Sequence, residues 1–343
     1  MKNTFFNQDN TNYQNLLNSI STTYVGGQQN AVKLARREML ITYWHIGQHI
    51  VEFEQKGQDK ATHGIKLIEQ LSKDLSHQLG KGFGRSNLIY IRLLYLKFNN
   101  ITLLSHQLTW GHYYELLKID MDLERRFYEK QAILERWNIR ELKRQKKAAL
   151  FLRLAASKDK EGVLKLAEQG RIIENPEDIL RDPYILEFLK VPEPYHLSES
   201  DLEERLITHL QRFLLELGKG FAFIGRQYRV TLGNRHHRVD LVFYHHILKC
   251  FVLIDLKKEE AGYEDIGQMN MYLGYFEEEE NTEGDNPPIG IVLAREKDEM
   301  VVRYATHRMN SQLFVSKYQL YLPNEEELRT QLEYILNLPE NEE

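Results

Sequence analysis

The chain has 343 residues, 42% of them hydrophobic, and a formal net charge of −5. That length favours two domains, and the hydrophobic content is enough for packed cores, which excludes a largely disordered chain. The single cysteine, Cys250, excludes an intrachain disulfide and a cysteine-rich zinc site. No apolar run approaches the ~20 residues of a membrane span and the N-terminus has no signal-peptide core, so we expect a cytoplasmic protein with no membrane partner.

The first part of the chain has the apolar spacing of helices. We expect an N-terminal tail over residues 1–27 and a helical N-terminal domain over residues 28–156. The helical segments read AVKLARREMLITYWHIGQHIVEF, GIKLIEQLSKDLSHQL, RSNLIYIRLLYLKF, LTWGHYYELLKI, DLERRFYEKQAILERW and IRELKRQKKAALFLRLAA. Residues 121–160 hold 12 Lys and Arg against six Asp and Glu, so the charge of this region is locally basic.

Residues 157–200 predict a linker. The part from Glu174 to Asp201 contains four of the eight prolines, which favours an extended segment or short turns. Residues 201–343 then predict an α/β domain, a mixed sheet flanked by helices in the order α-β-β-β-α-β-β. Its elements are the helices DLEERLITHLQRFLLELG and GYEDIGQMNMYLGYFEEE and the strands FAFIGRQYRVTLG, HRVDLVFYHH, LKCFVLIDLKK, PPIGIVLAREK and FVSKYQLYLP.

Ionisable residues interrupt two neighbouring strands of this domain. A hairpin that turns near Ile247 and Leu248 places Asp240 opposite Asp255, where the Cβ atoms of opposed residues are ~5 Å apart. Lys257 shares a face with Asp255 because side chains alternate along a strand.

Two close carboxylates repel each other unless a proton or a cation lies between them. Mg²⁺ binds such oxygen ligands together with waters and phosphate, and Mn²⁺ is expected to substitute. A lysine beside the metal would stabilise negative charge that develops on a phosphate. The pattern therefore indicates metal-assisted phosphodiester hydrolysis, and the alternative is that both aspartates serve as turn caps or ion-pair partners.

The arrangement Asp240, fourteen residues, then Asp255-Leu256-Lys257 resembles the signature of the PD-(D/E)XK nuclease superfamily. Two further features extend the resemblance. Glu203 on the preceding helix matches the glutamate that joins the metal site in that superfamily, although Glu204 next to it is an alternative. Gln268 on the following helix begins the Gln-apolar-x-x-Tyr pattern of the RecB-like branch. Gln268 is read as a site residue, whereas Tyr272, which ends the pattern, is read as a packing residue.

Longer segments resemble the YhcG family, whose members join a helical N-terminal domain to a PD-(D/E)XK domain. These segments are GFGRSNLIYIRLLYLKF, LTWGHYYELLKI, RWNIRELKRQ, ELGKGFAFIGRQYRV, DLVFYHHILKCFVLIDLK, GQMNMYLGYF and NPPIGIVLA. The family more often has Glu where this chain has Asp255. The resemblance implies a Mg²⁺-dependent nuclease with Asp240, Asp255 and Glu203 as metal ligands, acting on DNA in restriction, repair or mobile-element defence. The alternative is a catalytically inactive nucleic-acid-binding or scaffold subunit.

Six side chains of the N-terminal domain are candidates for nucleic-acid contacts, or else simply face water. They are Arg85, Asn87, Arg92, Lys143, Arg144 and Lys147. The N-terminal domain could instead mediate a homo-oligomer or dock a partner protein. The pairs His236-His237 and His245-His246 are read as exposed residues without an assigned role. The sequence pattern is compatible with DNA or RNA as the substrate and with endo- or exonuclease action.

Overall fold

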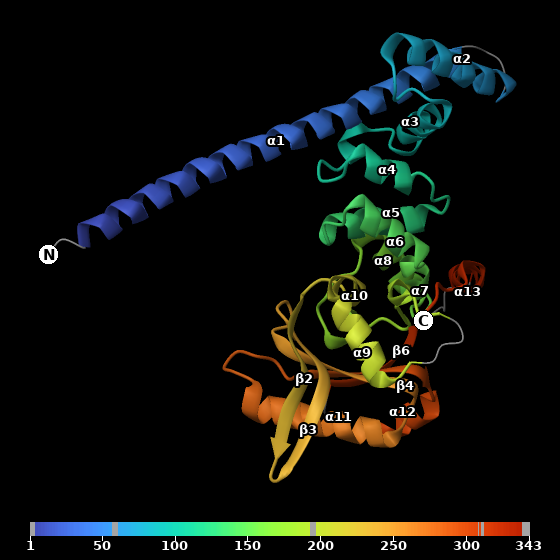
Figure 1. Cartoon of the computed structure of the whole chain (residues 1–343). Coiled ribbons are helices and arrows are strands. Elements are labelled where there is room, and N and C mark those ends of the chain that lie inside the picture. Colours follow the sequence, from blue (N-terminus) through green and yellow to red (C-terminus); the bar gives the residue numbers. More distant parts are fainter. Residues whose placement is uncertain (1–3, 57–60, 193–196, 308, 310–311, 338–343) are drawn as a thin grey trace. The chain divides into compact units, whose positions relative to one another are not determined.

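The computed structural model describes residues 4–56, 61–192, 197–307, 309 and 312–337, and it divides into two compact units, Met1–Asp120 and Met121–Glu343 (Figure 1). Within the described residues, no helix combines the length and apolar character needed to cross a membrane.

The first unit is entirely helical. Its elements are α1 (Thr4–Lys56), α2 (Ala61–Leu79), α3 (Arg85–Lys97), the 3-10 turn η1 (Ile101–Leu103) and α4 (Trp110–Leu116). Ile50, Ile68, Leu88 and Ile91 form its buried cluster. A Cβ atom at Gly47 would lie 2.3 Å from the carbonyl oxygen of Ile91, so the glycine permits the close approach of α1 and α3.

The structure differs from the predicted tail over residues 1–27. Residues 4–27 belong to α1, which continues without a break to Lys56. Their polar sequence lacks a strong apolar stripe, which is why the pattern did not predict a helix. The first proline of the chain is Pro176, so nothing in this stretch removes a backbone donor and ends the helix.

The second unit begins with helices and turns that precede the main sheet. They are α5 (Asp122–Leu134), α6 (Ile139–Lys147), α7 (Leu150–Ala155), α8 (Lys160–Gln169), η2 (Pro176–Ile179), the short strand β1 (Tyr184–Ile185) and η3 (Glu187–Leu189). The predicted linker over residues 157–200 thus contains a helix, α8, which Asp159 caps at the backbone N–H of Gly162. The predicted domain boundaries at 156 and 200 remain predictions, and the compact units meet at Asp120 and Met121.

A six-stranded mixed sheet forms the centre of the second unit. Its elements are α9 (Glu199–Thr208), α10 (Leu210–Leu217), β2 (Phe221–Leu232), β3 (Arg235–His245), β4 (Cys250–Ala261), α11 (Tyr263–Tyr275), the π-helical turn η4 (Phe276–Glu280), β5 (Ile289–Lys297), α12 (Glu299–Ala305), β6 (Gln312–Gln319) and α13 (Glu325–Asn337). The strand order is β1-β6-β5-β4-β3-β2, antiparallel among β2, β3 and β4 and parallel from β4 to β1. The predicted fold class is confirmed, but the single helix predicted from residue 201 is two helices that meet at His209.

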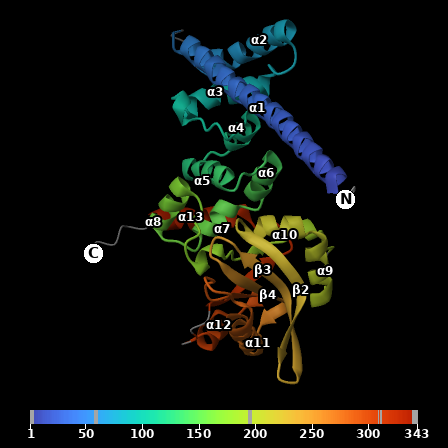
Figure 2. The ribbon, with the colours of Figure 1, turned by 90° about the vertical axis from the view of Figure 1, so that its left-hand side faces the viewer.

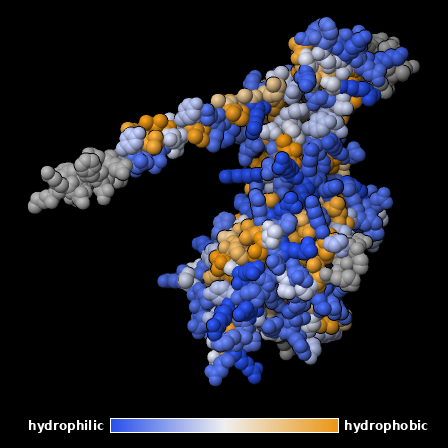
Figure 3. Space-filling model, in the orientation of Figure 1, coloured by the Kyte–Doolittle hydropathy of each residue, from blue (hydrophilic) through white to orange (hydrophobic). Residues whose placement is uncertain are grey.

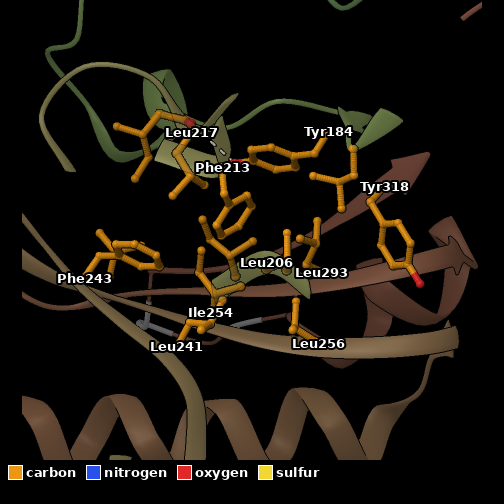
Figure 4. Close-up of a cluster of buried hydrophobic side chains, with 14 of the residues drawn as sticks. Tyr184, Leu206, Phe213, Leu217, Leu241, Phe243, Ile254, Leu256, Leu293 and Tyr318 are labelled. Carbon is orange, nitrogen blue, oxygen red and sulfur yellow. Dashed lines mark hydrogen bonds between the residues drawn. The ribbon is translucent and has the colours of Figure 1, made fainter. Parts of the chain in front are cut away.

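Helices cover both faces of this sheet (Figure 1, Figure 2). On one face, side chains of α9 and α10 such as Leu206 and Phe213 pack on Phe243 and Ile254 (Figure 4). On the other face, α11 packs through residues that include Met269 against a second cluster. Leucines and aromatics of this kind each contribute roughly 1.5–3 kcal/mol when fully buried.

A buried carboxylate ties the early helices of this unit to the sheet. Glu216 of α10 is fully buried and lies 3.0 Å from Arg144, 3.2 Å from Arg153 and 3.3 Å from Arg181. Burial alone would raise the pKa of Glu216, but the three guanidinium groups outweigh burial and lower it. Its Oε1 also accepts the backbone N–H of Ile185 at 2.9 Å, so α6, α7 and β1 share one ionic centre with α10.

Candidate active site

The pairing of β3 with β4 brings the two predicted aspartates to neighbouring positions. Leu241 pairs with Ile254, as the predicted register requires, and Asp240 and Asp255 are the next residues of the two strands. Asp240 Oδ2 accepts the backbone N–H of Leu256 at 2.8 Å. This bond fixes the carboxylate of Asp240 against β4.

Lys257 lies beside Asp255, as strand alternation predicts. Its Nζ is 2.9 Å from Asp255 Oδ2 and 3.3 Å from Asp265 Oδ1. Asp265, in the first turn of α11, also accepts the backbone N–H of Gly262 at 2.8 Å. Sequence reasoning missed Asp265 because an acid in a first helical turn usually serves only as a cap.

Burial and charge perturb the protonation of these groups. Burial raises the pKa of Asp255, 4% exposed, to about 7, with a further contribution from the charge of Asp240 and an opposing one from Lys257. Burial alone would lower the pKa of Lys257, but Asp255 and Asp265 outweigh it and raise that pKa. Lys257 therefore stays protonated at neutral pH, whereas Asp255 is divided between its two forms.

The structure distinguishes between Glu203 and Glu204 on α9. Glu203 is 6% exposed and faces the hairpin, whereas Glu204 is exposed to solvent. Burial raises the pKa of Glu203, and the charge of Asp240 adds to the shift against a hydrogen bond from Gln227. Of the two glutamates, Glu203 is thus the one that shares a hydrogen-bond partner, Gln227, with Asp240.

Gln227 joins two of the carboxylates and was not identified from the sequence. Its Nε2 donates to Glu203 Oε2 at 2.5 Å and to Asp240 Oδ1 at 2.9 Å. Its φ is +48°, in the left-handed region that non-glycine residues rarely adopt. The signal in the sequence was a polar residue two positions after Gly225 inside an otherwise strand-like run, which a pattern of alternating residues does not explain.

Near Asp240, the side chains of β3 switch from one face of the sheet to the other. Val239 packs in the cluster beneath α11, whereas Leu241, two residues later, packs in the cluster beneath α9 and α10. Regular alternation would put both on one face. Together with the positive φ of Gln227, the change turns the side chains around Asp240, as irregularities beside active sites commonly do.

The carboxylates suit a hard divalent cation in their chemistry. Asp255 Oδ2 is buried and has no hydrogen bond in correct geometry, although it lies 2.9 Å from Lys257 Nζ. Such an oxygen has charge available for a metal, and carboxylate oxygens are the donors that Mg²⁺ prefers. Among the described residues, however, no three His, Cys, Asp or Glu side chains form a ready metal-binding group. The amide of Gln227 lies between Glu203 and Asp240 and satisfies both.

Gln268 does not contact these carboxylates through a hydrogen bond in this structure. Its Nε2 donates to the hydroxyl of Tyr272 at 2.8 Å, and that hydroxyl donates to the carbonyl of Arg238 at 3.0 Å. Tyr272 is buried in the cluster beneath α11, as its reading as a packing residue predicts. Gln268 and Tyr272 thus connect α11 to β3 at Arg238, which lies two residues before Asp240.

The predicted nucleic-acid contacts of α3 are engaged within their own unit. Arg85 lies 3.5 Å from Glu69, and Arg92 lies 2.7 Å from Glu54. Asn87 donates to the carbonyl of Gly82 at 2.5 Å and accepts from the indole of Trp110 at 3.1 Å.

The three candidates on α6 differ in exposure. Arg144 is largely buried and bound to Glu216 and to Glu187, which suits a role in packing. Lys143 and Lys147 are exposed.

One histidine reading was wrong. His245 is fully buried, and its Nε2 lies 3.0 Å from the carbonyl of Lys219. Gly220 makes room for this ring, because a Cβ there would lie 2.3 Å from it. His236 and His246 are exposed, as expected, whereas His237 is half-buried and contacts the ring of Tyr272.

Comparison with solved structures gives weak overall similarity. A repair endonuclease from Pyrococcus abyssi aligns with a TM-score of 0.27 and 20% identity over 38% of this chain and 50% of that chain. A structure described as an EndoMS–dsDNA complex aligns with a TM-score of 0.27 and 20% identity over 39% and 49% of the two chains.

Sequence comparison is far stronger. Residues 177–333 match the family model described as the YhcG PDDEXK nuclease domain, and residues 19–153 match the DUF1016 N-terminal domain. The chain is 36% identical to the Escherichia coli (strain K12) protein named "Putative nuclease YhcG", and the alignment covers 93% of each protein. The Asp240–Asp255–Lys257 arrangement thus lies inside the matched nuclease domain, and the chain belongs to the YhcG family of PD-(D/E)XK nuclease domain proteins.

Proposed function

We propose that this protein is a metal-dependent nuclease that hydrolyses phosphodiester bonds of DNA. The observation that carries the proposal is the buried Asp255, which follows the Leu241–Ile254 pair as Asp240 precedes it and lies 2.9 Å from the Nζ of Lys257. Membership of a nuclease family supports the same reaction class. A role in restriction, repair or mobile-element defence and a cytoplasmic location remain expectations.

Asp240, Asp255 and Glu203 would hold a divalent metal, Mg²⁺ or Mn²⁺. When bound, the metal would supply Lewis acidity at the phosphate and lower the pKa of a coordinated water. The raised pKa of Lys257 favours a role as a hydrogen-bond donor over a role as a general base at neutral pH. Its ammonium group would orient the attacking water and stabilise the charge that develops on the phosphate, which is commonly worth a factor of about 10²–10³ in rate.

Gln268 would act indirectly, through residues that support Asp240. Through Tyr272 it fixes the backbone of Arg238, and so the approach of β3 to Asp240. We propose that it is a positioning residue rather than a group that touches substrate.

The helical region is proposed as a second source of nucleic-acid affinity. Lys143 and Lys147 are its exposed candidates on α6, and Arg85, Asn87 and Arg92 could contribute after exchanging their present partners. The rival proposal is that this region docks a partner protein or forms a homo-oligomer.

Cleavage assays test the proposal directly. Linear, circular, branched and single-stranded DNA, and RNA, would be incubated with Mg²⁺, Mn²⁺ or EDTA. We expect cleavage of DNA with either metal and none with EDTA. Lys257→Ala should lower the rate by about 10² or more, whereas Lys258→Ala, the exposed neighbour, should leave it unchanged.

Two outcomes would reject the proposal. Equal rates of DNA cleavage by Lys257→Ala and the unaltered protein would show that the site assignment is wrong. Binding without cleavage of any substrate would favour the non-catalytic alternative, which the hydrogen bonds of Gln227 to Glu203 and Asp240 make a specific possibility.

A further inference from the structure

The β2–β3 hairpin continues past the candidate site as a two-stranded ribbon. Leu232 pairs with Arg235 at its tip, with Gly233 in the left-handed region at φ +58°. In two perpendicular views the tip extends away from the rest of the second unit (Figure 1, Figure 2). The stretch from Arg226 to Arg238 contains four arginines and two histidines and no acidic residue. The tip is accordingly strongly hydrophilic (Figure 3).

The two faces of the ribbon have different character. One face packs toward α11 through Tyr228, Val230, His237 and Val239. By strand alternation, the opposite face carries Arg229, Thr231, His236 and Arg238. Arg229 pairs directly with Arg238, and Thr231 with His236. The basic residues therefore lie together on the face that has no helix packed against it.

The charges on this face are not balanced by acids. Arg229 and Arg238 are exposed, and in the part of the chain that the structure describes neither makes an ion pair. Arg229 Nη2 instead lies 2.9 Å from His236 Nε2. Like charges directly opposite each other destabilise a strand pair, because their Cβ atoms are only ~5 Å apart. An anion held between the two guanidinium groups would remove that repulsion.

The ribbon also begins at the candidate site. Arg238 precedes Asp240 by two residues, about 7 Å along an extended strand, and His236 is about 13 Å away. On the ribbon's opposite, apolar face, the hydroxyl of Tyr228 hydrogen-bonds to the carboxylate of Glu280. A nucleic-acid backbone on the basic face would therefore run toward the carboxylates without passing that acid.

We propose that the basic face of the β2–β3 ribbon, formed by Arg229, His236 and Arg238, binds the phosphate backbone of duplex DNA and guides it to Asp240. Guanidinium groups bind phosphate oxygens in bidentate geometry. A two-stranded ribbon is also narrow enough to enter the major groove. The guiding role rests on the proposed nuclease function, whereas the binding itself does not.

Salt-dependent binding of the full-length protein tests the surface. Affinity for a DNA duplex would be measured in EDTA, so that cleavage does not interfere, at salt concentrations from 50 to 200 mM. The variants are Arg229→Gln/Arg238→Gln, the charge-preserving Arg229→Lys/Arg238→Lys, and the control Arg303→Gln on α12, which is exposed and lies outside the ribbon. Melting curves verify that each variant is folded.

Two lost phosphate contacts should reduce the slope of log affinity against log salt by about 1.8. The affinity ratio between 50 and 200 mM salt then shrinks about tenfold for the glutamine pair, and stays unchanged for the lysine pair and for Arg303→Gln. An unchanged slope for the folded glutamine pair overturns the proposal. If duplex DNA, RNA and polyglutamate compete equally well for the ribbon, the ribbon is a general anion-binding surface. That result would also overturn the proposal. If the unaltered protein binds through the ribbon but cleaves nothing, the nuclease proposal and the guiding role fail, whereas the DNA-binding surface stands.

Discussion

Gln227 combines backbone strain with two hydrogen bonds to carboxylates. A non-glycine residue in the left-handed region costs on the order of 1–3 kcal/mol and persists only when its surroundings hold it there. Here the amide holds Glu203 and Asp240. A metal that needs the same oxygens competes with this amide, so Gln227 should set how readily the site accepts a cation.

Substitution of Gln227 separates these two effects. Gln227→Ala removes the amide and keeps the strain, whereas Gln227→Gly removes both. We expect both variants to lose stability without metal at pH 8, and the glycine variant to be more stable than the alanine variant by about 1 kcal/mol. Urea unfolding measures the difference. A glycine variant less stable than the alanine variant would show that the positive φ carries no cost.

The raised pKa of Asp255 predicts how stability depends on pH. The pKa is about 7 in the folded chain and near 3.9 when unfolded, so between these values the folded state binds more protons. The contribution of Asp255 to stability therefore falls as pH rises through this window. Asp255→Asn should stabilise the metal-free protein at pH 8 by on the order of 1 kcal/mol, and less at pH 5.

Thermal melting at several pH values, with Glu168→Gln as an exposed control, measures this effect. Mg²⁺ should raise the melting temperature of the unaltered protein more at pH 8 than at pH 6, because a proton on Asp255 competes with the metal. A pH-independent difference between Asp255→Asn and the unaltered protein would mean that Asp255 titrates normally.

At the scale of elements, local patterns predicted the β3–β4 hairpin of the candidate site well. The turn near Ile247 fixed the register, and the strong alternation of β4 placed Asp255 and Lys257 on one face. The patterns did not predict that the side chains of β3 switch sheet faces at Asp240. This switch depends on the positive φ of Gln227 and on the packing of helices against both faces of the sheet. The exposed ribbon was likewise not predicted, because its basic residues come together on one face only when β2 and β3 pair.

Glu216 lies at the contact between the early helices of the second unit and the sheet. Glu216→Ala leaves Arg144, Arg153 and Arg181 without their shared carboxylate, and breaking a buried ion pair costs roughly 3–5 kcal/mol. We expect the melting temperature of the second unit to fall strongly, and that of Glu168→Ala on the surface of α8 to change little. Similar melting temperatures for the two variants would show that the ionic centre contributes no net stability.

At the scale of the whole molecule, the family match and the compact unit begin at different places. The nuclease family model starts at residue 177, whereas the second compact unit starts at Met121. Sequence patterns set the end of the helical domain near residue 156 because helical spacing continues to that point. The ion pairs of Arg144 and Arg153 with Glu216 link residues more than 60 positions apart, and no local pattern reveals such pairs.

Two fragments distinguish these starting points. A fragment of residues 177–343 retains every proposed catalytic residue but lacks Arg144 and Arg153, so Glu216 keeps only Arg181 in the buried centre. A fragment of residues 121–343 retains all three arginines. We expect the longer fragment to unfold cooperatively, and the shorter one to be less stable by several kcal/mol, since it buries a carboxylate with fewer partners.

Urea unfolding of the two fragments beside the full-length protein measures this difference, and Glu216→Ala serves as the control in each. The substitution should destabilise the longer fragment more than the shorter one, because the shorter one has already lost two of the three ion pairs. Fragments of equal stability would place the folding boundary near residue 177 instead. In that case α5–α8 would pack on the nuclease domain without supporting it, and the buried arginines would have to serve another purpose than holding the unit together.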